Sequence, residues 1–146
     1  MYGKILVASD GSHHSEAAVR TAVEMAKRCG AELVLITVAE TTRGINALFN
    51  PLQVSEQMEI IHRATEATQD RIEEEAEEQA ERAGITFHAR REQGHPADRI
   101  VAAAKEEKAD LIVVGARGLG AFAALMLGSV STGVIHHAPC SVLVVK

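Results

Sequence analysis

Short apolar segments alternate with stretches of helical periodicity along this chain, and this alternation constrains the fold more than any other feature. The apolar segments have the length of strands and cover residues 4–8, 31–38, 85–89, 110–115 and 141–145. Between them apolar residues recur every three or four positions over residues 12–29, 55–83, 129–136 and a stretch that begins at Pro96. Strands that alternate with helices predict a parallel sheet with right-handed crossovers. The predicted fold is a three-layer α/β sandwich, with a five-stranded parallel sheet and helices on both of its faces.

Residues at the predicted helix ends support this division of the chain. Ser12 is a suitable N-cap for the first helix, and Gly30 suits the residue just after its last turn. Gly84 ends the second helix, Pro96 lies in the first turn of the third, and Pro139 ends the fourth. Residues 39–54 have no clear period, so they predict an irregular loop.

Each helix is expected to bury one apolar stripe. In the first helix this stripe consists of Ala18, Ala22, Met25, Ala26 and Cys29. In the second helix it consists of Ile61, Thr65 or Ala64, Thr68, Ile72, Ala76, Ala80 and Ala83. The acidic run at residues 73–78 predicts a solvated face of that helix. Residues 85–89 alternate between apolar and polar, which favours an edge strand.

A glycine-rich passage follows the fourth predicted strand. Gly115 and Gly118 come directly after the apolar residues 111–114, and nine residues later Gly128-Ser129 begins a predicted helix. Glycines allow sharp turns and close approach of the backbone to a ligand, and the free N–H groups at a helix start attract anions. The passage therefore predicts a pocket for a phosphate group.

An acidic residue is expected to face this passage. Asp10 follows the first predicted strand, as Gly115 follows the fourth. In open parallel sheets, ligands bind beyond the carboxyl ends of the strands, where the strand order reverses. If the first strand is central and the fourth lies beside it, Asp10 and the glycine passage meet in one crevice.

Length and composition narrow the classes of function. The 146 residues suit one domain, residues 1–146, that buries its own core. The net charge of −5 and the aromatic content of 3% make nucleic acid an unexpected partner. No apolar run reaches the ~20 residues of a membrane span, and no signal peptide is evident, so a cytoplasmic location is expected.

The cysteines and histidines predict no metal site or disulfide. Cys29 and Cys140 form no CxxC pair, and small hydrophobic core residues are the expected role of both. Two adjacent histidines on a helix, as at residues 13–14 and 136–137, point about 100° apart and chelate one ion poorly. The chain contains no HExxH motif.

The passage resembles the motif of the universal stress protein family, which is glycine, two residues, glycine, nine residues, glycine, then serine or threonine. Gly115, Gly118, Gly128 and Ser129 keep that spacing. The opening ILVASDGS, the segment from Gly94 to Ile100 and the C-terminal GSVSTGVIHHAPCSVLVVK also resemble the family, so the likeness covers the whole chain.

The resemblance implies an adenine nucleotide alpha-hydrolase-like, Rossmann-like fold that binds ATP, or AMP or ADP, with Mg²⁺ accompanying the nucleotide. By position, Asp10 would contact ribose, and the backbone of Ala8 and Val38 would contact adenine. The glycines and the start of the last helix would line the phosphates. The implied contacts are Ala8, Ser9, Asp10, Val38, Gly115, Arg117, Gly118, Gly128, Ser129, Val130 and Ser131.

Some of these residues have an alternative interpretation in which their role is purely structural. Arg117 either neutralises phosphate charge or is an exposed loop residue. Asp10 either accepts from ribose hydroxyls or forms an Asx-turn at the start of the first helix. Ser129 is a phosphate ligand or an N-cap. The apolar residues 119–127 either fold over the core or form a lid or dimer surface.

The expected function is a nucleotide-dependent regulatory or stress-response protein whose regulated partner the sequence does not identify. No Walker lysine, nucleophile elbow or evident catalytic base is present, so no catalytic residue is assigned. A slow ATPase or phosphotransferase is the enzymatic alternative. A receiver-type switch would need a second acid beside Asp10, which this chain does not have. A flavin carrier would need aromatic residues beside its ring, and this chain has only three Phe and one Tyr. The apolar C-terminal strand is expected to pair with a second copy in a homodimer.

Overall fold

The computed structural model describes residues 1–40, 51–118 and 127–146, and it describes residues 51–54 by their backbone alone. In chain order the elements are β1 (Lys4–Ala8), α1 (His13–Cys29), β2 (Glu32–Ala39), α2 (Pro51–Ala83), β3 (Phe87–Gln93), α3 (Pro96–Glu107), β4 (Leu111–Gly115), α4 (Ser129–His137) and β5 (Ser141–Val145). The expectations for residues 41–50 and 119–126 lie outside the described residues.

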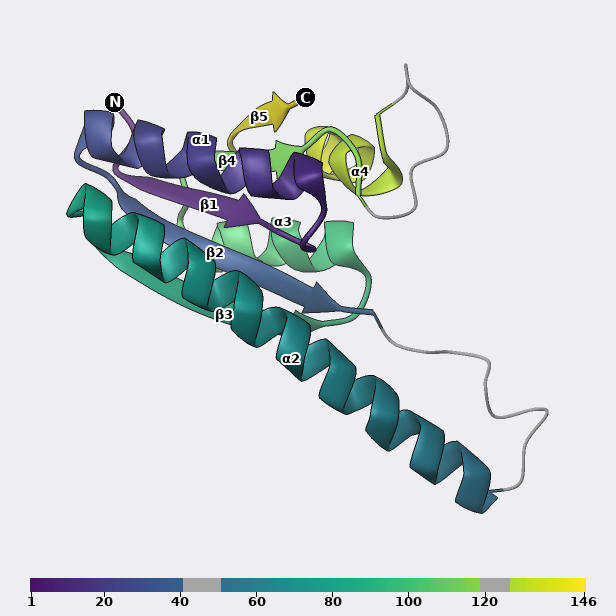
Figure 1. Cartoon of the computed structure of the whole chain (residues 1–146). Coiled ribbons are helices and arrows are strands. Elements are labelled where there is room, and N and C mark those ends of the chain that lie inside the picture. Colours follow the sequence, from purple (N-terminus) through teal and green to yellow (C-terminus); the bar gives the residue numbers. More distant parts are fainter. Residues whose placement is uncertain (41–50, 119–126) are drawn as a thin grey trace.

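The five strands form one parallel sheet in the order β3-β2-β1-β4-β5 (Figure 1). Helices α1 and α2 pack on one face of the sheet, and α3 and α4 pack on the other. This arrangement confirms the predicted three-layer fold. It also confirms that β1 is central and that β4 lies beside it, so the strand order reverses between these two strands.

Alternate residues of the central strands build two cores. Ile5 and Val7 of β1 face α1 and α2, whereas Leu6 faces α3 and α4. All three side chains are fully buried, as are most residues of β2 and β4. Because both faces of a parallel sheet are covered, its strands are apolar without alternation.

The ends of α1 lie where the sequence predicts them. The Ser12 hydroxyl accepts a hydrogen bond from the Ser15 N–H at 3.3 Å, and Gly30 adopts the left-handed conformation with φ of 65°. The predicted buried stripe was partly wrong, because Cys29 is exposed and Met25 is only half-buried. Val19 and Val23 take those inward positions.

Helix α2 is longer than predicted, and its buried stripe is shorter. It begins at Pro51 rather than Ser55, because proline fits a first helical turn, where its missing N–H has no partner. Ile61 and Thr68 were expected to be buried but are exposed. For Ile61 the physical reason is that the N-terminal half of α2 projects past the sheet and has no layer to pack on (Figure 1). Thr68 is exposed because it lines an open cavity at the carboxyl edge of the sheet.

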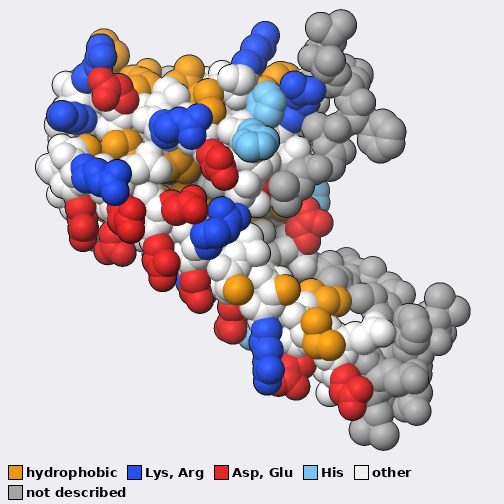
Figure 2. Space-filling view, in the orientation of Figure 1, with side chains coloured by type: hydrophobic (Ala, Val, Ile, Leu, Met, Phe, Trp, Pro, Cys, Tyr) orange, Lys and Arg blue, Asp and Glu red, His pale blue; other side chains and the backbone are white. Residues whose placement is uncertain are grey.

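The solvated face predicted for α2 is confirmed. Acidic side chains follow the length of the helix, and apolar ones gather on its projecting part (Figure 2). Glu74, Glu75 and Glu78 are exposed, and Glu73 pairs with Arg91 of β3 at 2.6 Å. Among the described helices, none has the length and hydropathy of a membrane span.

Strand β3 is an edge strand, as predicted, but it covers residues 87–93 instead of 85–89. It pairs with β2 from Leu33–Phe87 through to Ala39–Gln93. The alternating pattern predicted an earlier end to the strand, because Arg90 and Arg91 interrupt it. Both arginines stay in an edge strand because carboxylates neutralise them, among them Glu107 at 2.8 Å from Arg90.

Backbone contacts fix the start of β1 and hence the position of its carboxyl end. The Asp110 carboxylate accepts hydrogen bonds from the N–H groups of Gly3 and Lys4 at 2.8 and 2.9 Å. These hydrogen bonds, first the one from Lys4, hold the pKa of Asp110 below its usual value. The anchor sets the register of β1 beside β4.

Candidate functional site

A cavity of about 740 Å³ lies at the edge of the sheet where β1, β2 and β4 end. This volume is typical of a small-molecule site, roughly 300–1,000 Å³. Every residue implied as a ligand contact lines this cavity, namely Ala8, Ser9, Asp10, Val38, Gly115, Arg117, Gly118, Gly128, Ser129, Val130 and Ser131. The fold therefore brings together residues from three separate parts of the sequence.

Asp10 and the glycine passage meet inside this cavity. The Oδ1 atom of Asp10 accepts a hydrogen bond from the Ser12 N–H at 2.9 Å, so the Asx-turn interpretation is confirmed. A Cβ atom added to Gly118 would lie only 2.5 Å from Asp10 Oδ2. Gly118 thus leaves the space that the acidic side chain occupies, and the predicted meeting of acid and passage is confirmed.

A cluster of buried serine side chains holds the loop that carries Asp10. Ser15 Oγ lies 3.1 Å from Ser9 Oγ and 3.2 Å from Ser12 Oγ, and it also accepts from the Asp10 N–H at 3.3 Å. Ser9 Oγ accepts from the Gly11 N–H. These hydrogen bonds satisfy polar groups that are buried, so the loop is fixed before any ligand arrives.

The start of α4 opens into the same cavity. Gly128 is its N-cap, and the first hydrogen bond of the helix runs from the Thr132 N–H to the Gly128 carbonyl at 3.0 Å. The N–H groups of Ser129, Val130 and Ser131 precede that bond and have no acceptor within the helix. Such a helix start attracts an anion, which is the chemistry that the sequence predicts here.

The buried hydroxyl of Ser131 holds this helix start in place. Its side chain is 2% exposed, and its hydroxyl lies 3.0 Å from the carbonyl oxygens of Ala116 and Gly128, to which it donates. The Gly128 N–H donates to the same Ala116 carbonyl at 2.7 Å. The hydroxyl therefore joins the two ends of the glycine passage. Ser129, by contrast, is the first helical residue and not the N-cap.

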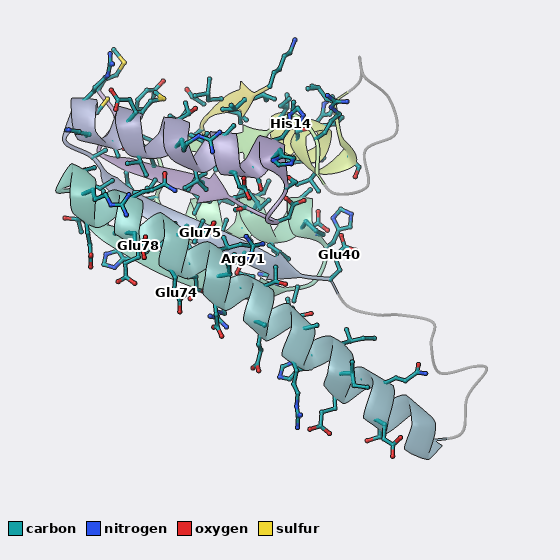
Figure 3. The ribbon with its side chains drawn as sticks, viewed as in Figure 1. His14, Glu40, Arg71, Glu74, Glu75 and Glu78 are labelled. Carbon is teal, nitrogen blue, oxygen red and sulfur yellow. The ribbon has the colours of Figure 1, made fainter. Side chains whose placement is uncertain are left out.

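Arg117 is half-buried in the cavity wall, so the interpretation as an exposed loop residue is wrong. Its Nη2 atom lies 3.3 Å from Nε2 of His14, so that ring nitrogen accepts the hydrogen bond. His14 lies at the beginning of α1, and Glu40 follows β2 at the same end of the molecule (Figure 3). The wall thus places a guanidinium beside the first turn of α1, on a residue whose Cα would lie 3.4 Å from a Cβ added to Gly128, the N-cap of α4.

Gly115 has a packing role that differs from the role of Gly118. A Cβ atom at Gly115 would lie 2.7 Å from the backbone carbon of His14 and 2.9 Å from its oxygen. The absence of a side chain lets the first turn of α1 rest directly against the end of β4.

The wall that α2 contributes to the cavity was not predicted from the sequence. Thr37 of β2 is 2% exposed and Gln69 of α2 is 8% exposed, and Gln69 Nε2 donates to Thr37 Oγ1 at 3.1 Å. A threonine inside an otherwise apolar strand was the signal that could have located this wall. The other lining residues that the sequence did not indicate are Ser15, Ile36, Ala39, Glu40, Ala64, Thr65, Thr68, Ile72, Pro96, Ile100 and Val114.

In the part of the chain that the structure describes, no three histidine, cysteine or carboxylate side chains converge in a way that could hold a metal ion. Cys29 and Cys140 are free thiols, and the buried role expected for both is wrong for Cys29, which is exposed.

The model of the universal stress protein family matches residues 1–146. The chain belongs to this family. A universal stress protein of Thermus aquaticus, encoded in the QAH/OAS sulfhydrylase 3′ region, is 38% identical over 150 residues that cover all of both chains. Universal stress protein YxiE of Bacillus subtilis is 36% identical over 148 residues, again covering both chains fully.

Solved structures of universal stress proteins share the fold. UspA from Lactobacillus plantarum superposes with a TM-score of 0.84 at 28% identity, covering 99% of this chain and 98% of that one. A universal stress protein in complex with cAMP has a TM-score of 0.73 at 33% identity over 99% and 97% of the chains. One from Archaeoglobus fulgidus in complex with dAMP has a TM-score of 0.63 at 25% identity over 99% and 98%.

Proposed function

We propose that this universal stress protein binds an adenine nucleotide in the cavity at the carboxyl edge of its sheet. ATP with its accompanying Mg²⁺ is the favoured ligand, and AMP and ADP are alternatives. The observation that carries the proposal is the meeting of Asp10, the glycine passage and the start of α4 in one cavity. A nucleotide needs a hydroxyl acceptor and an anion site at a fixed separation, and this cavity offers both.

The phosphate end of the nucleotide is assigned to α4. The free N–H groups of residues 129–131 donate to phosphate oxygens, and the helix dipole adds about 0.3–1 kcal/mol of attraction. Arg117 lies in the wall beside them and supplies a positive charge. Gly118 and Gly128 leave the space for close approach, while the Ser131 hydroxyl, bonded to two carbonyls, positions the passage.

The ribose and the base are assigned to the ends of β1 and β2. Asp10 accepts from the ribose hydroxyls, and the Ser9 network keeps it in place. The backbone at Ala8 and Val38 contacts the base, against apolar neighbours such as Ile100. The family members that were solved with cAMP and dAMP support an adenine nucleotide as the ligand class.

The proposed biological role is a cytoplasmic stress-response regulator whose nucleotide occupancy is recognised by a partner protein. The chain contains no Walker lysine, so binding rather than turnover is the proposed activity.

Calorimetric titration with ATP, ADP, AMP and adenosine tests the phosphate site. We expect affinity to fall as phosphates are removed, with adenosine at least about tenfold weaker than ATP. Arg117→Ala should narrow the difference between ATP and adenosine, because the guanidinium acts on phosphate alone. Lys105→Ala, which changes an exposed cation on α3, is the matched control. Equal affinity for ATP and adenosine in the wild type would refute the assigned phosphate end.

A homodimer through β5 is the proposed assembly. This strand is at the edge of the sheet, and Val142–Val145 are only half-buried although they are apolar. An unpaired apolar edge is prone to pair with another strand. In sedimentation equilibrium we expect about twice the monomer mass of 15.6 kDa, and a shift toward monomer for Leu143→Lys. Thr86→Lys, beside the opposite sheet edge, should leave the mass unchanged; a monomeric wild type would contradict the proposal.

A further inference from the structure

Two buried polar side chains in the cavity wall have no evident structural task. In the described residues the buried polar side chains are Ser9, Ser12, Ser15, Thr37, Gln69 and Ser131. The serines hold the Asp10 loop or the glycine passage through hydrogen bonds to backbone groups. Thr37 and Gln69 instead bond to each other, across 32 residues of sequence. Burying such a pair costs free energy that an apolar pair would not cost, so it needs another reason.

Both side chains face the cavity from the side of β2 and α2. Thr37 follows Ile36 in β2 and points toward α2, where Gln69 precedes the core residue Ile72 by one helical turn. Both residues line the cavity together with Val38. The hydrogen bond to Thr37 uses one of the two N–H donors of the Gln69 amide. One N–H and the carbonyl oxygen of that amide are left for a ligand.

The order of the strands places this amide at one end of a nucleotide. In the sheet, β2, β1 and β4 are consecutive neighbours, spaced by ~4.8 Å each. Gln69 lies over the β2 side, Asp10 ends β1, and the glycine passage follows β4. A nucleotide has its ribose between its base and its phosphate, so its three parts match the spatial order of Gln69, Asp10 and the glycine passage. The amide therefore lies where the base would be.

We infer that Gln69 recognises the adenine base through its amide and that Thr37 positions this amide. The inference rests on the proposed function and names a specificity residue for it. A glutamine amide forms a pair of hydrogen bonds with adenine, accepting from N6 and donating to N7. Guanine carries an oxygen in place of the N6 amino group, so the Gln69 carbonyl would face another acceptor. Gln69 accordingly selects adenine over guanine.

Calorimetric titration of the full chain with ATP and GTP in Mg²⁺ tests this inference. We expect the wild type to bind ATP at least about tenfold more tightly than GTP, the discrimination of one bidentate pair. Gln69→Leu roughly keeps the side-chain volume. It should weaken the affinity for ATP about tenfold and bring the ratio of ATP to GTP affinity close to one. Thr37→Val should lower the same ratio by a smaller factor. Gln79→Leu, on the same helix but outside this cavity, should match the wild type.

The outcomes separate this inference from the proposed function. If the wild type binds ATP and Gln69→Leu keeps the wild-type ratio, the inference is wrong and the proposed function stands. If Gln69→Leu lowers the affinities for ATP and GTP by equal factors, Gln69 only supports the cavity wall, and the inference is also wrong. If the wild type binds neither nucleotide, both fail. Circular dichroism spectra of the variants check that a change in the ratio of ATP to GTP affinity does not come from unfolding.

Discussion

Replacing Gly118 with alanine will weaken ATP binding by at least about tenfold and leave the stability of the fold nearly unchanged. The added Cβ would lie 2.5 Å from Asp10 Oδ2, a distance that real Cβ atoms do not tolerate. Gly118 has no positive φ, so alanine adds no backbone strain there. The side chain of Asp10 or the glycine passage must move, and either shift separates the ribose acceptor from the phosphate site.

A double-mutant cycle shows whether this loss acts through Asp10. In the Asp10→Ala background the obstructed carboxylate is already gone, so Gly118→Ala should cost much less affinity than in the wild type. Calorimetry with ATP measures all four proteins, and Gly3→Ala is the control, because its Cβ would make only an ordinary contact of 3.4 Å. Additive losses would show that Gly118 acts on the ligand directly and not through Asp10.

Replacing Gly115 with alanine will instead destabilise the fold, by about 1–3 kcal/mol, the usual cost of overpacking a tight contact. The new Cβ would lie within 3 Å of the backbone of His14, and a helix backbone cannot rotate away as a flexible side chain can. The first turn of α1 must therefore lift from the end of β4. Urea unfolding at neutral pH measures the free energy, with Gly118→Ala and Gly3→Ala measured beside it.

The two alanine variants thus separate two tasks within one sequence motif. We expect Gly115→Ala to shift the unfolding midpoint and Gly118→Ala to shift the affinity. If Gly115→Ala unfolds at the same urea concentration as the wild type, the close contact between α1 and β4 is not needed for stability. The motif would then have to be explained by ligand contacts at every glycine.

The sequence predicted the sheet, its layers and one side of the cavity, for reasons that are local. Apolar runs such as Leu111–Val114 are buried only as strands with both faces covered. The hydrogen bonds that cap α1 at Ser12 and Gly30 are made with residues close in sequence. Asp10 and Gly118 could be paired on the condition that β1 is central and β4 lies beside it, and the observed strand order meets that condition.

The α2 wall could not be predicted, because it depends on how far a helix extends past its sheet. Periodicity placed Ile61 and Thr68 in the core, yet Ile61 lies in the half of α2 that projects past the sheet (Figure 1), and Thr68 lines the open cavity. Gln69 lies on the same helical face as the predicted stripe but was not assigned to it because it is polar. Its burial depends on a contact with Thr37 that no local pattern records. Tertiary geometry decides such positions, so the base side of the cavity emerged only from the structure.

The most direct test of nucleotide binding in this cavity is a titration of ¹⁵N-labelled protein with Mg²⁺–ATP, followed by NMR. We expect saturable shifts of the backbone amides of Asp10, Val38, Gly118, Ser129 and Val130, which surround the cavity from β1, β2 and α4. Amides on the far side of the sheet, such as that of Gly84, should not move. Spectra that stay unchanged at millimolar ATP, or shifts that gather away from the carboxyl edge of the sheet, would contradict the account.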